Sequence, residues 1–553
     1  MKSRIQTSVD LASFKREISK KYKIPCPSNI QLLKDYHELV KNKRVKKSPI
    51  LEKLLRTRPI RSLSGIVNIS VLTKPYPCPG KCIYCPTEKG IPKSYLSGEP
   101  AVERAKSLNY DPYLQVKKRL EMLENEGHPT DKVELRIVGG TWSYYPRDYQ
   151  IWFITRCFEA CNDFDSAENP KSKIQNPKQI QNSKSQILKK EQRKNEKAKH
   201  RIVGISIETR PDFINEKEIK KLRDLGVTMV ELGVQSIYDD VLKINLRGHR
   251  VKETILATKL LKDAGFKVLY QVMPDLPGSC LKRDEEMFEE LFRNPDFRPD
   301  YLKIYPCAVL KEAPLYGWWK RGKYQPYSKE KLLGLIKEIK KKIPSYVRIQ
   351  RIARDIPSPS VAAGGAKISN LRQIIQEDMK KEKWKCKCIR CRELKENYNP
   401  KEKIYLFRED YDASWGKEIF LSLENKNRSK LFSFLRLRIP QQRHNQLTTV
   451  SELCPIFPVL KNAAIIREIQ TFGAVVPIGG KKIALPAEAR RAKAGAQHRG
   501  LGKKLLKQAE KITKKEFGLK KIAVISGVGA RDYFRKLGYR LKDSYMFKLK
   551  SDY

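Results

Sequence analysis

Long apolar runs and acidic residues are both scarce in this 553-residue chain. No uninterrupted apolar stretch approaches the roughly 18 residues that a membrane-spanning helix needs. The first ten residues carry charge and lack the apolar core of a secretion signal. These absences exclude membrane-embedded and secreted classes of protein, so we expect a cytoplasmic protein with no membrane partner.

Asp and Glu total 62 against 114 Lys and Arg, which gives a formal net charge of +52. Such an imbalance is typical of proteins that bind a polyanion, because each phosphate that is neutralised releases counterions. A lysine-rich protein without a nucleic-acid ligand is the alternative. The chain is also too long for one hydrophobic core, so we expect two or three domains.

The 12 cysteines include two short clusters. In a reducing compartment, clustered cysteines bind metal or catalyse and rarely form disulfides. The first cluster lies in VLTKPYPCPGKCIYCP, where Cys78, Cys82 and Cys85 are spaced C-x3-C-x2-C. Three thiolates at this spacing can bind three irons of a [4Fe–4S] cluster and leave the fourth iron open to a chelating ligand. A structural zinc knuckle is the alternative, although zinc usually takes four protein ligands.

The second cluster lies in WKCKCIRCRE and supplies Cys386, Cys388 and Cys391. We interpret it as a structural zinc site that fixes how two domains meet. Free thiols and a second iron–sulfur cluster are the alternatives. The candidates for a fourth ligand are a histidine, Cys280, Cys307 and Cys454.

From residue 65 onward, short apolar strands alternate with amphipathic helices. This alternation predicts an α/β fold with a parallel sheet, as an open or closed (βα) barrel. Residues 166–200 interrupt the pattern because they are rich in Asn, Gln, Lys and Ser, and we expect a disordered insertion there. The predicted strands lie at residues 65–72, 133–138, 202–207, 228–234, 267–272, 301–304 and 347–350.

Polar and glycine-rich segments follow these strands, where barrel enzymes place their chemistry. Gly139 and Gly140 follow the second strand, and a glycine pair lets the backbone approach a ligand closely. Glu208, Arg210 and Gln235 end or follow the third and fourth strands, and they offer the charges and donors that an amino-acid group and a ribose need. Each alone is an ordinary strand-end turn, but together they predict a ligand site.

The last part of the chain predicts a separate α+β domain with a helix that starts near residue 501. The turn before this helix has the pattern Q-x-x-G-x-G, which presents backbone N–H groups and the positive helix end to a pyrophosphate. Acetyltransferases of the GNAT superfamily hold coenzyme A in this way. Tyr533 lies in a late helix where such enzymes keep an aromatic residue near the thioester, and a plain core role is equally open. The turn consists of Gln497, His498, Arg499, Gly500, Leu501 and Gly502.

Taken in this order, the motifs resemble the catalytic-subunit family of Elongator in its stand-alone archaeal and bacterial form, a family of tRNA uridine acetyltransferases or carboxymethyltransferases. The resemblance covers nearly the whole chain, from residue 58 to residue 548. Besides the first cysteine cluster, it rests on residues 138–141, 208–212, 233–236, 247–249, 273–277, 303–306 and 522–529.

The resemblance implies a tRNA-modifying enzyme whose cofactors are a [4Fe–4S] cluster, S-adenosylmethionine and acetyl-CoA. A 5′-deoxyadenosyl radical would abstract hydrogen from the acetyl methyl group. The carbon radical would add to C5 of the wobble uridine, and hydrolysis would leave a carboxymethyl group. The expected partners are the anticodon stem-loop of tRNA and a reductant, and the chain could be a monomer or a homodimer.

On this chain the family pattern places the [4Fe–4S] cluster on the first cysteine cluster and coenzyme A at residues 497–502. Glu208, Arg210 and Tyr533 are the residues that we expect to act in catalysis. S-adenosylmethionine would lie near Gly139, Gly140, Glu208, Arg210 and Gln235.

These expectations divide the chain into four parts. They are a basic helical tRNA-binding segment (1–64), a radical S-adenosylmethionine barrel (65–380), a cysteine-rich metal-binding linker (381–400) and a GNAT acetyltransferase domain (401–553). Two other functions fit parts of the pattern. One is a radical enzyme acting on a small metabolite, fused to an independent protein lysine N-acetyltransferase. The other is an RNA-binding scaffold without catalysis.

Overall fold

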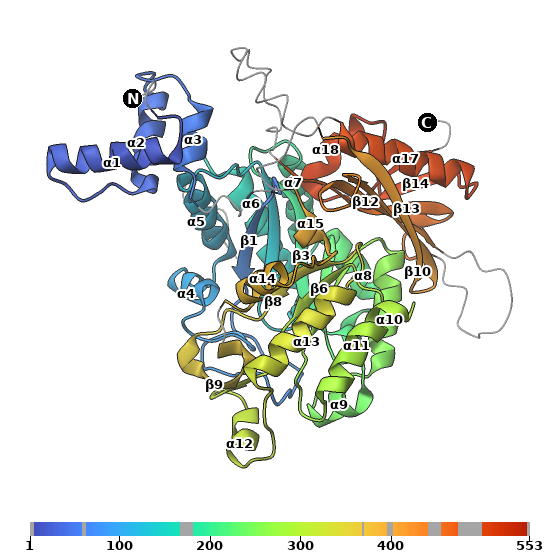
Figure 1. Ribbon diagram of the computed structural model, residues 1–553. Helices are drawn as coiled ribbons and strands as arrows, with labels where there is room; N and C mark the ends of the chain where they lie inside the picture. Colours follow the sequence, from blue (N-terminus) through green and yellow to red (C-terminus); the bar gives the residue numbers. More distant parts are fainter. Residues whose placement is uncertain are drawn as a thin grey trace.

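The computed structural model describes residues 5–57, 62, 64–165, 181–367, 370–394, 402–440, 455–473 and 500–549. Two large sheets with their helices lie side by side, and a small helical module stands at the N-terminal end (Figure 1). Among the described residues, no helix combines the length and the apolar character needed to cross a bilayer.

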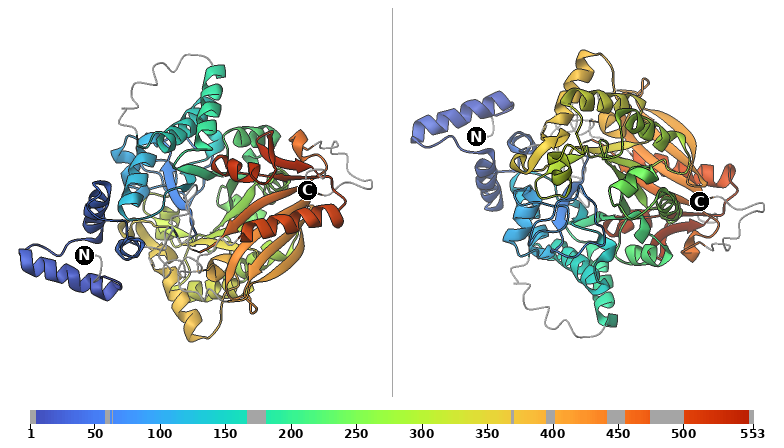
Figure 2. Two further views of the ribbon diagram at one scale, coloured as in Figure 1. Left: turned by 90° about the horizontal axis from the view of Figure 1, so that it is seen from above. Right: turned by 90° about the horizontal axis from the view of Figure 1, so that it is seen from below.

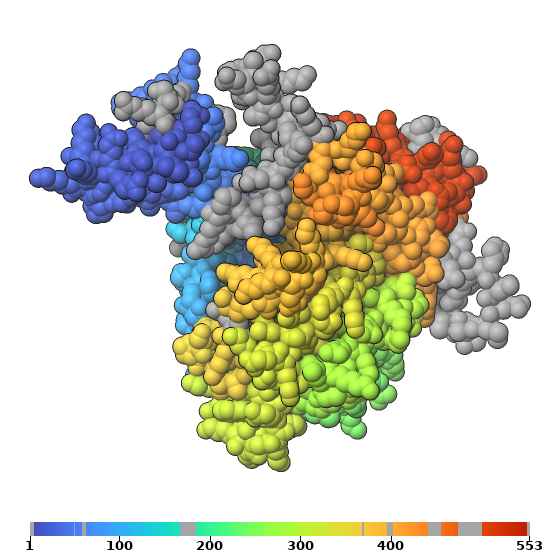
Figure 3. All heavy atoms as spheres, viewed as in Figure 1, coloured from blue at the N-terminus to red at the C-terminus, as the bar shows by residue number. Residues whose placement is uncertain are grey.

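The N-terminal module consists of α1 (Ser8–Tyr22), α2 (Asn29–Lys41) and α3 (Pro49–Leu55). These helices project from the side of the barrel in every view (Figures 1 and 2), and the space-filling view shows them at the margin of the molecule (Figure 3). Their apolar faces pack against one another, so the module has a small core that is separate from the main one. That core includes Leu11, Leu33, Tyr36 and Leu55.

The first sheet contains seven parallel strands whose order in the sheet follows their order in the chain. It curls into an incomplete ring (Figure 2), which confirms the predicted partial (βα) barrel. The central strand β4 is buried along its whole length, as expected of a strand covered on both faces. The strands are β1 (Val67–Leu72), β2 (Lys132–Val138), β3 (Arg201–Thr209), β4 (Met229–Gln235), β5 (Lys267–Val272), β6 (Tyr301–Ile304) and β8 (Arg348–Ile352).

Helices connect these strands and cover the outside of the ring. A two-stranded antiparallel sheet of β7 (Ala308–Leu310) and β9 (Val361–Gly364) lies beyond β6 and β8. The helices are α4 (Pro100–Ser107), α5 (Pro112–Asn125), α6 (Arg147–Asn162), α7 (Gln181–Asn195), α8 (Glu216–Asp224), α9 (Asp239–Ile244), α10 (Val251–Asp263), α11 (Leu281–Arg293), α12 (Leu315–Lys320), α13 (Lys329–Lys342), α14 (Leu371–Lys381) and α15 (Ile389–Arg392).

The helix α7 corrects the predicted disordered insertion over residues 166–200. Residues 166–180 lie outside the described part of the chain, but residues 181–195 form this helix. Asn195 is fully buried: its side-chain amide donates to Asn162 Oδ1 at 2.8 Å and to the His200 carbonyl at 3.0 Å. The prediction failed because α7 is fixed largely by polar contacts, and its composition therefore resembles that of a disordered segment.

The second sheet is mixed, with the order β10-β11-β12-β13-β14-β16-β15. The strand β13 pairs in parallel with β14 only as far as Ile466, whereas it pairs with β12 out to Thr471. Among the described residues, no strand therefore pairs with the end of β13 on the β14 side. The elements are β10 (Tyr405–Ala413), β11 (Gly416–Glu424), β12 (Leu431–Pro440), β13 (Ala463–Thr471), α17 (Leu501–Lys515), β14 (Lys521–Val524), α18 (Arg531–Arg535), β15 (Arg540–Lys542) and β16 (Tyr545–Leu549).

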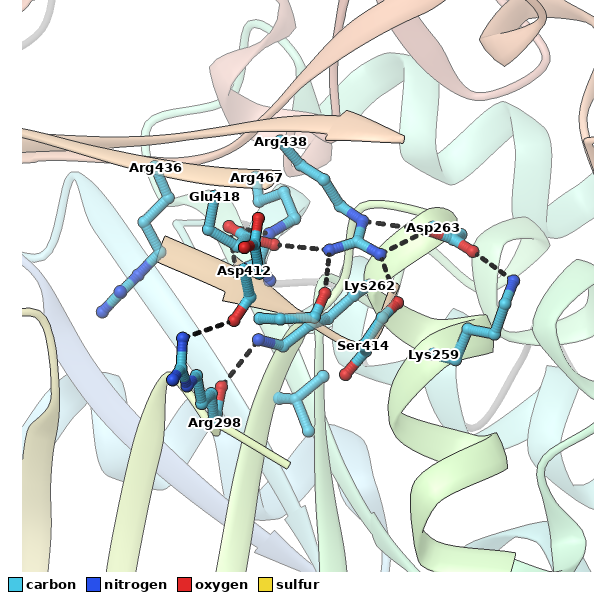
Figure 4. A network of polar contacts seen from close by, with 12 residues as sticks. Lys259, Lys262, Asp263, Arg298, Asp412, Ser414, Glu418, Arg436, Arg438 and Arg467 are labelled. Carbon is cyan, nitrogen blue, oxygen red and sulfur yellow. Dashed lines mark hydrogen bonds and ion pairs between the residues drawn. The ribbon is translucent and has the colours of Figure 1, made fainter. Parts of the chain in front are cut away.

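Buried ion pairs join the two sheets. Asp300, which lies immediately before β6, accepts from Arg467 of β13 at 2.7 and 2.5 Å. Asp263 at the end of α10 accepts from Arg438 of β12 at 2.9 and 2.5 Å, as the close view shows (Figure 4). Glu418 of β11 bonds both arginines, and the side chains of Arg438 and Arg467 have no exposed surface. Because a buried charge is costly without its partner, these pairs fix the orientation of one sheet against the other.

Candidate functional site

The first cysteine cluster lies on a loop that follows β1, at the carboxyl end of the barrel strands. Ile83 anchors this loop: its N–H donates to the Asn245 carbonyl at 3.3 Å, and its carbonyl accepts from Leu315 N–H at 2.8 Å. The N–H of Cys85 donates to the Cys82 carbonyl at 3.1 Å, which closes a tight turn. The loop is therefore held by the main-chain atoms of two other barrel segments rather than by its own contacts alone.

Gly80 lies between two of the three sulfurs. A Cβ atom at this position would lie 3.5 Å from Cys82 Sγ, 3.7 Å from Cys78 Sγ and 2.8 Å from Arg210 Nη1. Cys82 is buried, whereas Cys78 and Cys85 are partly exposed. The structure thus brings the sulfurs of Cys78 and Cys82 and the guanidinium of Arg210 around one residue.

Arg247 lies behind this loop and is 7% exposed. Its Nη1 donates to Cys82 Sγ at 3.4 Å, and its Nη2 donates to the Gly233 carbonyl at 2.6 Å. Burial opposes ionisation of the Cys82 thiol, but the Arg247 charge and its hydrogen bond lower the pKa of Cys82 below its ordinary value. The pKa of Cys85 is instead raised to about 11, chiefly by burial.

A cavity of about 950 Å³ runs from this loop into the ring of strands. Of the predicted ligand residues, Cys85, Glu208 and Gln235 line its wall. The side-chain oxygen of Gln235 is buried and has no hydrogen-bond partner in the described part of the chain. The wall therefore combines one cysteine of the loop with unsatisfied polar atoms, which is a pattern typical of a ligand site.

A layer of charged and polar side chains crosses the inside of the barrel, with one from each of four adjacent strands. Lys303 of β6 donates to Glu208 of β3 at 3.2 Å and also to Glu231 of β4. Gln271 of β5 donates to the same two carboxylates at 3.0 and 3.2 Å. Burial would raise the pKa of Glu208, but the Lys303 ammonium lowers it below its ordinary value. Glu208 is therefore an anion held in place at the cavity wall.

The other residues predicted to bind a ligand in the barrel are Arg210, Gly139 and Gly140, and they differ in their contacts. Arg210 forms a bidentate pair with Asp212 at 2.9 and 2.8 Å, while its Nη1 is buried and has no hydrogen-bond partner within the described ranges. Gly139 has φ +118°, and a Cβ there would lie 2.1 Å from Thr73 Oγ1, so close packing alone requires glycine. A Cβ at Gly140 would lie 3.8 Å from its nearest neighbour, so packing does not require glycine at that position.

In the second half, the start of α17 meets Tyr533 of α18. Gly500 precedes α17 with φ +75°, and a Cβ at Gly502 would lie 3.3 Å from the Tyr533 hydroxyl. The same Cβ would lie 3.8 Å from Thr471 Oγ1, at the end of β13. Tyr533 is 41% exposed, so it is not a core aromatic residue. Gln497, His498 and Arg499 lie outside the described residues, whereas Leu501 begins the helix.

The second cysteine cluster joins α14 to α15. The sulfurs of Cys386, Cys388 and Cys391 all lie within 4.8 Å of one another. Lys340 Nζ approaches Cys391 Sγ at 3.5 Å. Among the described residues, no further histidine, cysteine or carboxylate belongs to this group, so Cys280 and Cys307 are not its fourth ligand. Cys454 lies outside the described part.

Sequence reasoning gave no role to Arg247, Glu231, Gln271 or Lys303. For Glu231 and Lys303, the signal was a charged side chain within an otherwise apolar strand, as in MVELGV and YLKIY. In a parallel strand buried on both faces, such a residue points either at the core or at a ligand. Which residues face one another depends on strand register, which the sequence does not supply.

Comparison with known proteins places these features in a family. Residues 76–291 match the radical SAM superfamily, and residues 299–381 match the radical SAM C-terminal domain. A tRNA uridine(34) acetyltransferase of Methanocaldococcus infernus is 43% identical over 534 residues, which cover 94% of this chain and 91% of that protein. Elongator complex protein 3 of Homo sapiens is 38% identical over 518 residues, which cover 90% of this chain and 87% of that protein.

A solved structure gives the same result. The archaeal Elp3 of Methanocaldococcus infernus, with residues 1–46 deleted, is similar with a TM-score of 0.69 and 40% identity. The match covers 88% of this chain and all of that one. The similarity thus extends across both sheets and not over the barrel alone. The chain belongs to the family of tRNA uridine(34) acetyltransferases and Elongator complex protein 3.

Proposed function

We propose that this chain transfers a two-carbon unit from acetyl-CoA to C5 of the wobble uridine of tRNA and leaves a carboxymethyl group there. The observation that carries the proposal is that one chain holds two sites in a fixed arrangement. A cysteine loop lies at the mouth of a polar cavity in the barrel. Buried ion pairs fix the barrel to a second sheet, whose helix α17 begins with the kind of turn that binds the phosphates of acyl-CoA. Family membership supports the same reaction class.

The residues of the first half fit a [4Fe–4S] cluster and S-adenosylmethionine. Cys78, Cys82 and Cys85 would hold the cluster, because three thiolates from one loop leave a position open. Arg210 Nη1 and Gln235 Oε1 are buried and have no hydrogen-bond partners among the described residues, which suits a ligand with carboxylate and amino groups. When bound, these cofactors supply a 5′-deoxyadenosyl radical for hydrogen abstraction.

The residues of the second half fit the pantetheine and phosphate parts of acetyl-CoA. The N–H groups at the start of α17, at Leu501 and Gly502, would bind a phosphate, and Lys503 and Lys504 are exposed beside them. The end of β13 beyond Ile466, which has no partner on the β14 side in the part of the chain that the structure describes, would pair with the amide groups of pantetheine. The Tyr533 hydroxyl lies where it would orient the thioester.

The protein itself supplies orientation and exclusion of water. The hydrogen bond between Lys303 and Glu208 fixes both side chains in the cavity wall. The charges that face the substrate are therefore oriented before the substrate binds. The interface pairs Asp300–Arg467 and Asp263–Arg438 keep the acyl site at a fixed place relative to the barrel. A fixed separation matters because the reacting carbon atoms must be held within a few ångströms of each other.

A reaction with tRNA tests the proposal. Iron-loaded protein supplied with acetyl-CoA, S-adenosylmethionine, a reductant and an unmodified anticodon stem-loop should yield 5-carboxymethyluridine, measured by mass spectrometry of nucleosides. We expect acetyl-CoA turnover to rise at least about tenfold on adding this RNA. If about six or more phosphates are contacted, affinity should fall roughly 10³-fold between 50 and 200 mM salt.

A stem-loop with cytidine at the wobble position is the matched control and should remain unmodified. Acetylation of lysine peptides at the same rate with and without RNA would instead identify two independent enzymes in one chain. Binding of tRNA without any turnover would identify a scaffold. Either result would contradict the proposed function.

We also propose that Cys386, Cys388 and Cys391 hold a structural zinc ion. Three thiolates within 4.8 Å of one another suit the tetrahedral thiolate coordination of zinc. The variant Cys388→Ala should lose about one zinc per chain by elemental analysis and retain about four irons. Cys280→Ala removes an exposed thiol outside the cluster and should retain both metals. Zinc bound equally by Cys388→Ala and the wild type would refute the assignment.

A further inference from the structure

The guanidinium of Arg247 is a buried cation whose side-chain partner is a sulfur. Its Nη1 donates to Cys82 Sγ at 3.4 Å, and Nη2 donates to a main-chain carbonyl. Nε is buried and has no hydrogen-bond partner among the residues that the structure describes. Within the described part of the chain, no carboxylate forms an ion pair with Arg247; the nearby Asp212 is already engaged by both arms of Arg210.

A glycine in β4, Gly233, leaves room for the guanidinium of Arg247. A Cβ at Gly233 would lie 2.6 Å from Arg247 Nη2, so a larger residue at the end of β4 would displace the arginine. Burying a cation without a paired carboxylate costs several kcal/mol in typical proteins. A compensating negative charge must therefore be present in the working protein, and the atom that Arg247 contacts is Cys82 Sγ.

We propose that Arg247 sets the reduction potential of the iron–sulfur cluster, as a positioning residue that acts through Cys82. The inference rests on the proposed assignment of the cluster to Cys78, Cys82 and Cys85. Accepting one electron adds one negative charge to the cluster and its thiolates. A cation fixed beside one of those thiolates stabilises the reduced form more than the oxidised form, so it makes the cluster easier to reduce by a one-electron donor.

Arg247 differs from two other cations near the loop, Arg210 and Lys81, in its pairing and its burial. Arg210 is neutralised by its bidentate pair with Asp212. Lys81, next to Cys82 in sequence, is exposed, so water screens its charge. Removal of the Arg247 charge should therefore have a larger effect than removal of the Lys81 charge.

The experiment is a redox titration of the reconstituted full-length protein, followed by electron paramagnetic resonance of the reduced cluster. In Arg247→Met, the ratio of reduced to oxidised cluster at a fixed solution potential should fall at least about tenfold, which is 59 mV for a one-electron couple. Arg247→Lys keeps the charge and should stay within about threefold of the wild type. Lys81→Met is the matched control and should also stay within about threefold.

The titration has four informative outcomes for the role of Arg247. A shift confined to Arg247→Met supports the inference. An unchanged ratio in Arg247→Met, with the wild type carrying about four irons, overturns it and leaves the proposed function intact. Loss of iron from both Arg247 variants assigns the residue to cluster assembly and also overturns it. A wild-type protein that binds no iron instead contradicts the proposed function.

Discussion

Replacement of Cys82 by serine is expected to reduce iron from about four atoms per chain to background and to abolish modification of tRNA. Cys82 is the most buried cysteine of its loop, so water cannot readily replace the lost thiolate. Binding of coenzyme A should persist, because its proposed site at α17 belongs to the other sheet. Iron analysis and calorimetry with coenzyme A measure the two properties on the same sample.

Cys26→Ser provides the matched control, since it removes an exposed thiol of the N-terminal module that no cluster needs. It should retain iron and product formation at wild-type values. Full iron content in Cys82→Ser would show that this loop does not hold the cluster. Loss of coenzyme A binding in the same variant would show that the two sites are not independent.

The second large effect is expected at the interface of the two sheets. Asp300→Asn removes one of the two carboxylate charges that compensate Arg467, and Arg436 Nη1 also lies 3.7 Å from the same carboxylate. Loss of one partner of a buried pair costs about 3–5 kcal/mol, because the remaining charge stays out of water. We expect the thermal midpoint to fall by about 3–4 °C, because the entropy of unfolding is about 2.1 cal/mol/K per residue over a chain of 553 residues. Product formation should fall even at temperatures where the variant remains folded, because the acyl site is no longer held against the barrel.

The exposed pair of Arg283 and Asp240 offers a matched comparison, since it is also bidentate, with distances of 2.8 Å. Asp240→Asn should change the free energy of unfolding by less than about 1 kcal/mol, because solvent screens the pair. Differential scanning calorimetry of both variants makes the comparison. Equal, small shifts in the two would mean that the interface does not depend on Asp300.

Much of the barrel could be predicted from the sequence because its strands are buried on both faces. The predicted strands at residues 267–272 and 301–304 coincide with β5 and β6. The end of the chain, over residues 539–549, was less predictable. That segment makes a hairpin of β15 and β16, and its turn at Asp543 and Ser544 has positive φ values that the sequence did not indicate.

The interface between the two sheets also could not be predicted, and the reason differs from the one at the hairpin. The segment LFSFLRLRIP alternates apolar and basic residues towards its end, which is the pattern of a strand with one face in water. Arg436 and Arg438 nevertheless have no exposed side-chain surface, because the barrel covers that face. Whether an alternating face meets water or another domain depends on contacts distant in sequence. For the same reason, the sequence did not predict the layer of polar side chains around Lys303, whose partners come from β3, β4 and β5.

The incomplete ring of strands has a consequence for the size of molecule that can react. Asn68 and Ser70 of β1 and Gln350 and Arg351 of β8, the two end strands of the sheet, all line the same cavity. A closed eight-stranded barrel admits reactants only over its rim, which suits metabolites. On the proposed function, a nucleotide that is still part of a polymer would enter sideways between β1 and β8, which do not pair with each other in the described part of the chain, while its neighbours remain outside. Such lateral entry would let a macromolecule present one base without being threaded through a pore.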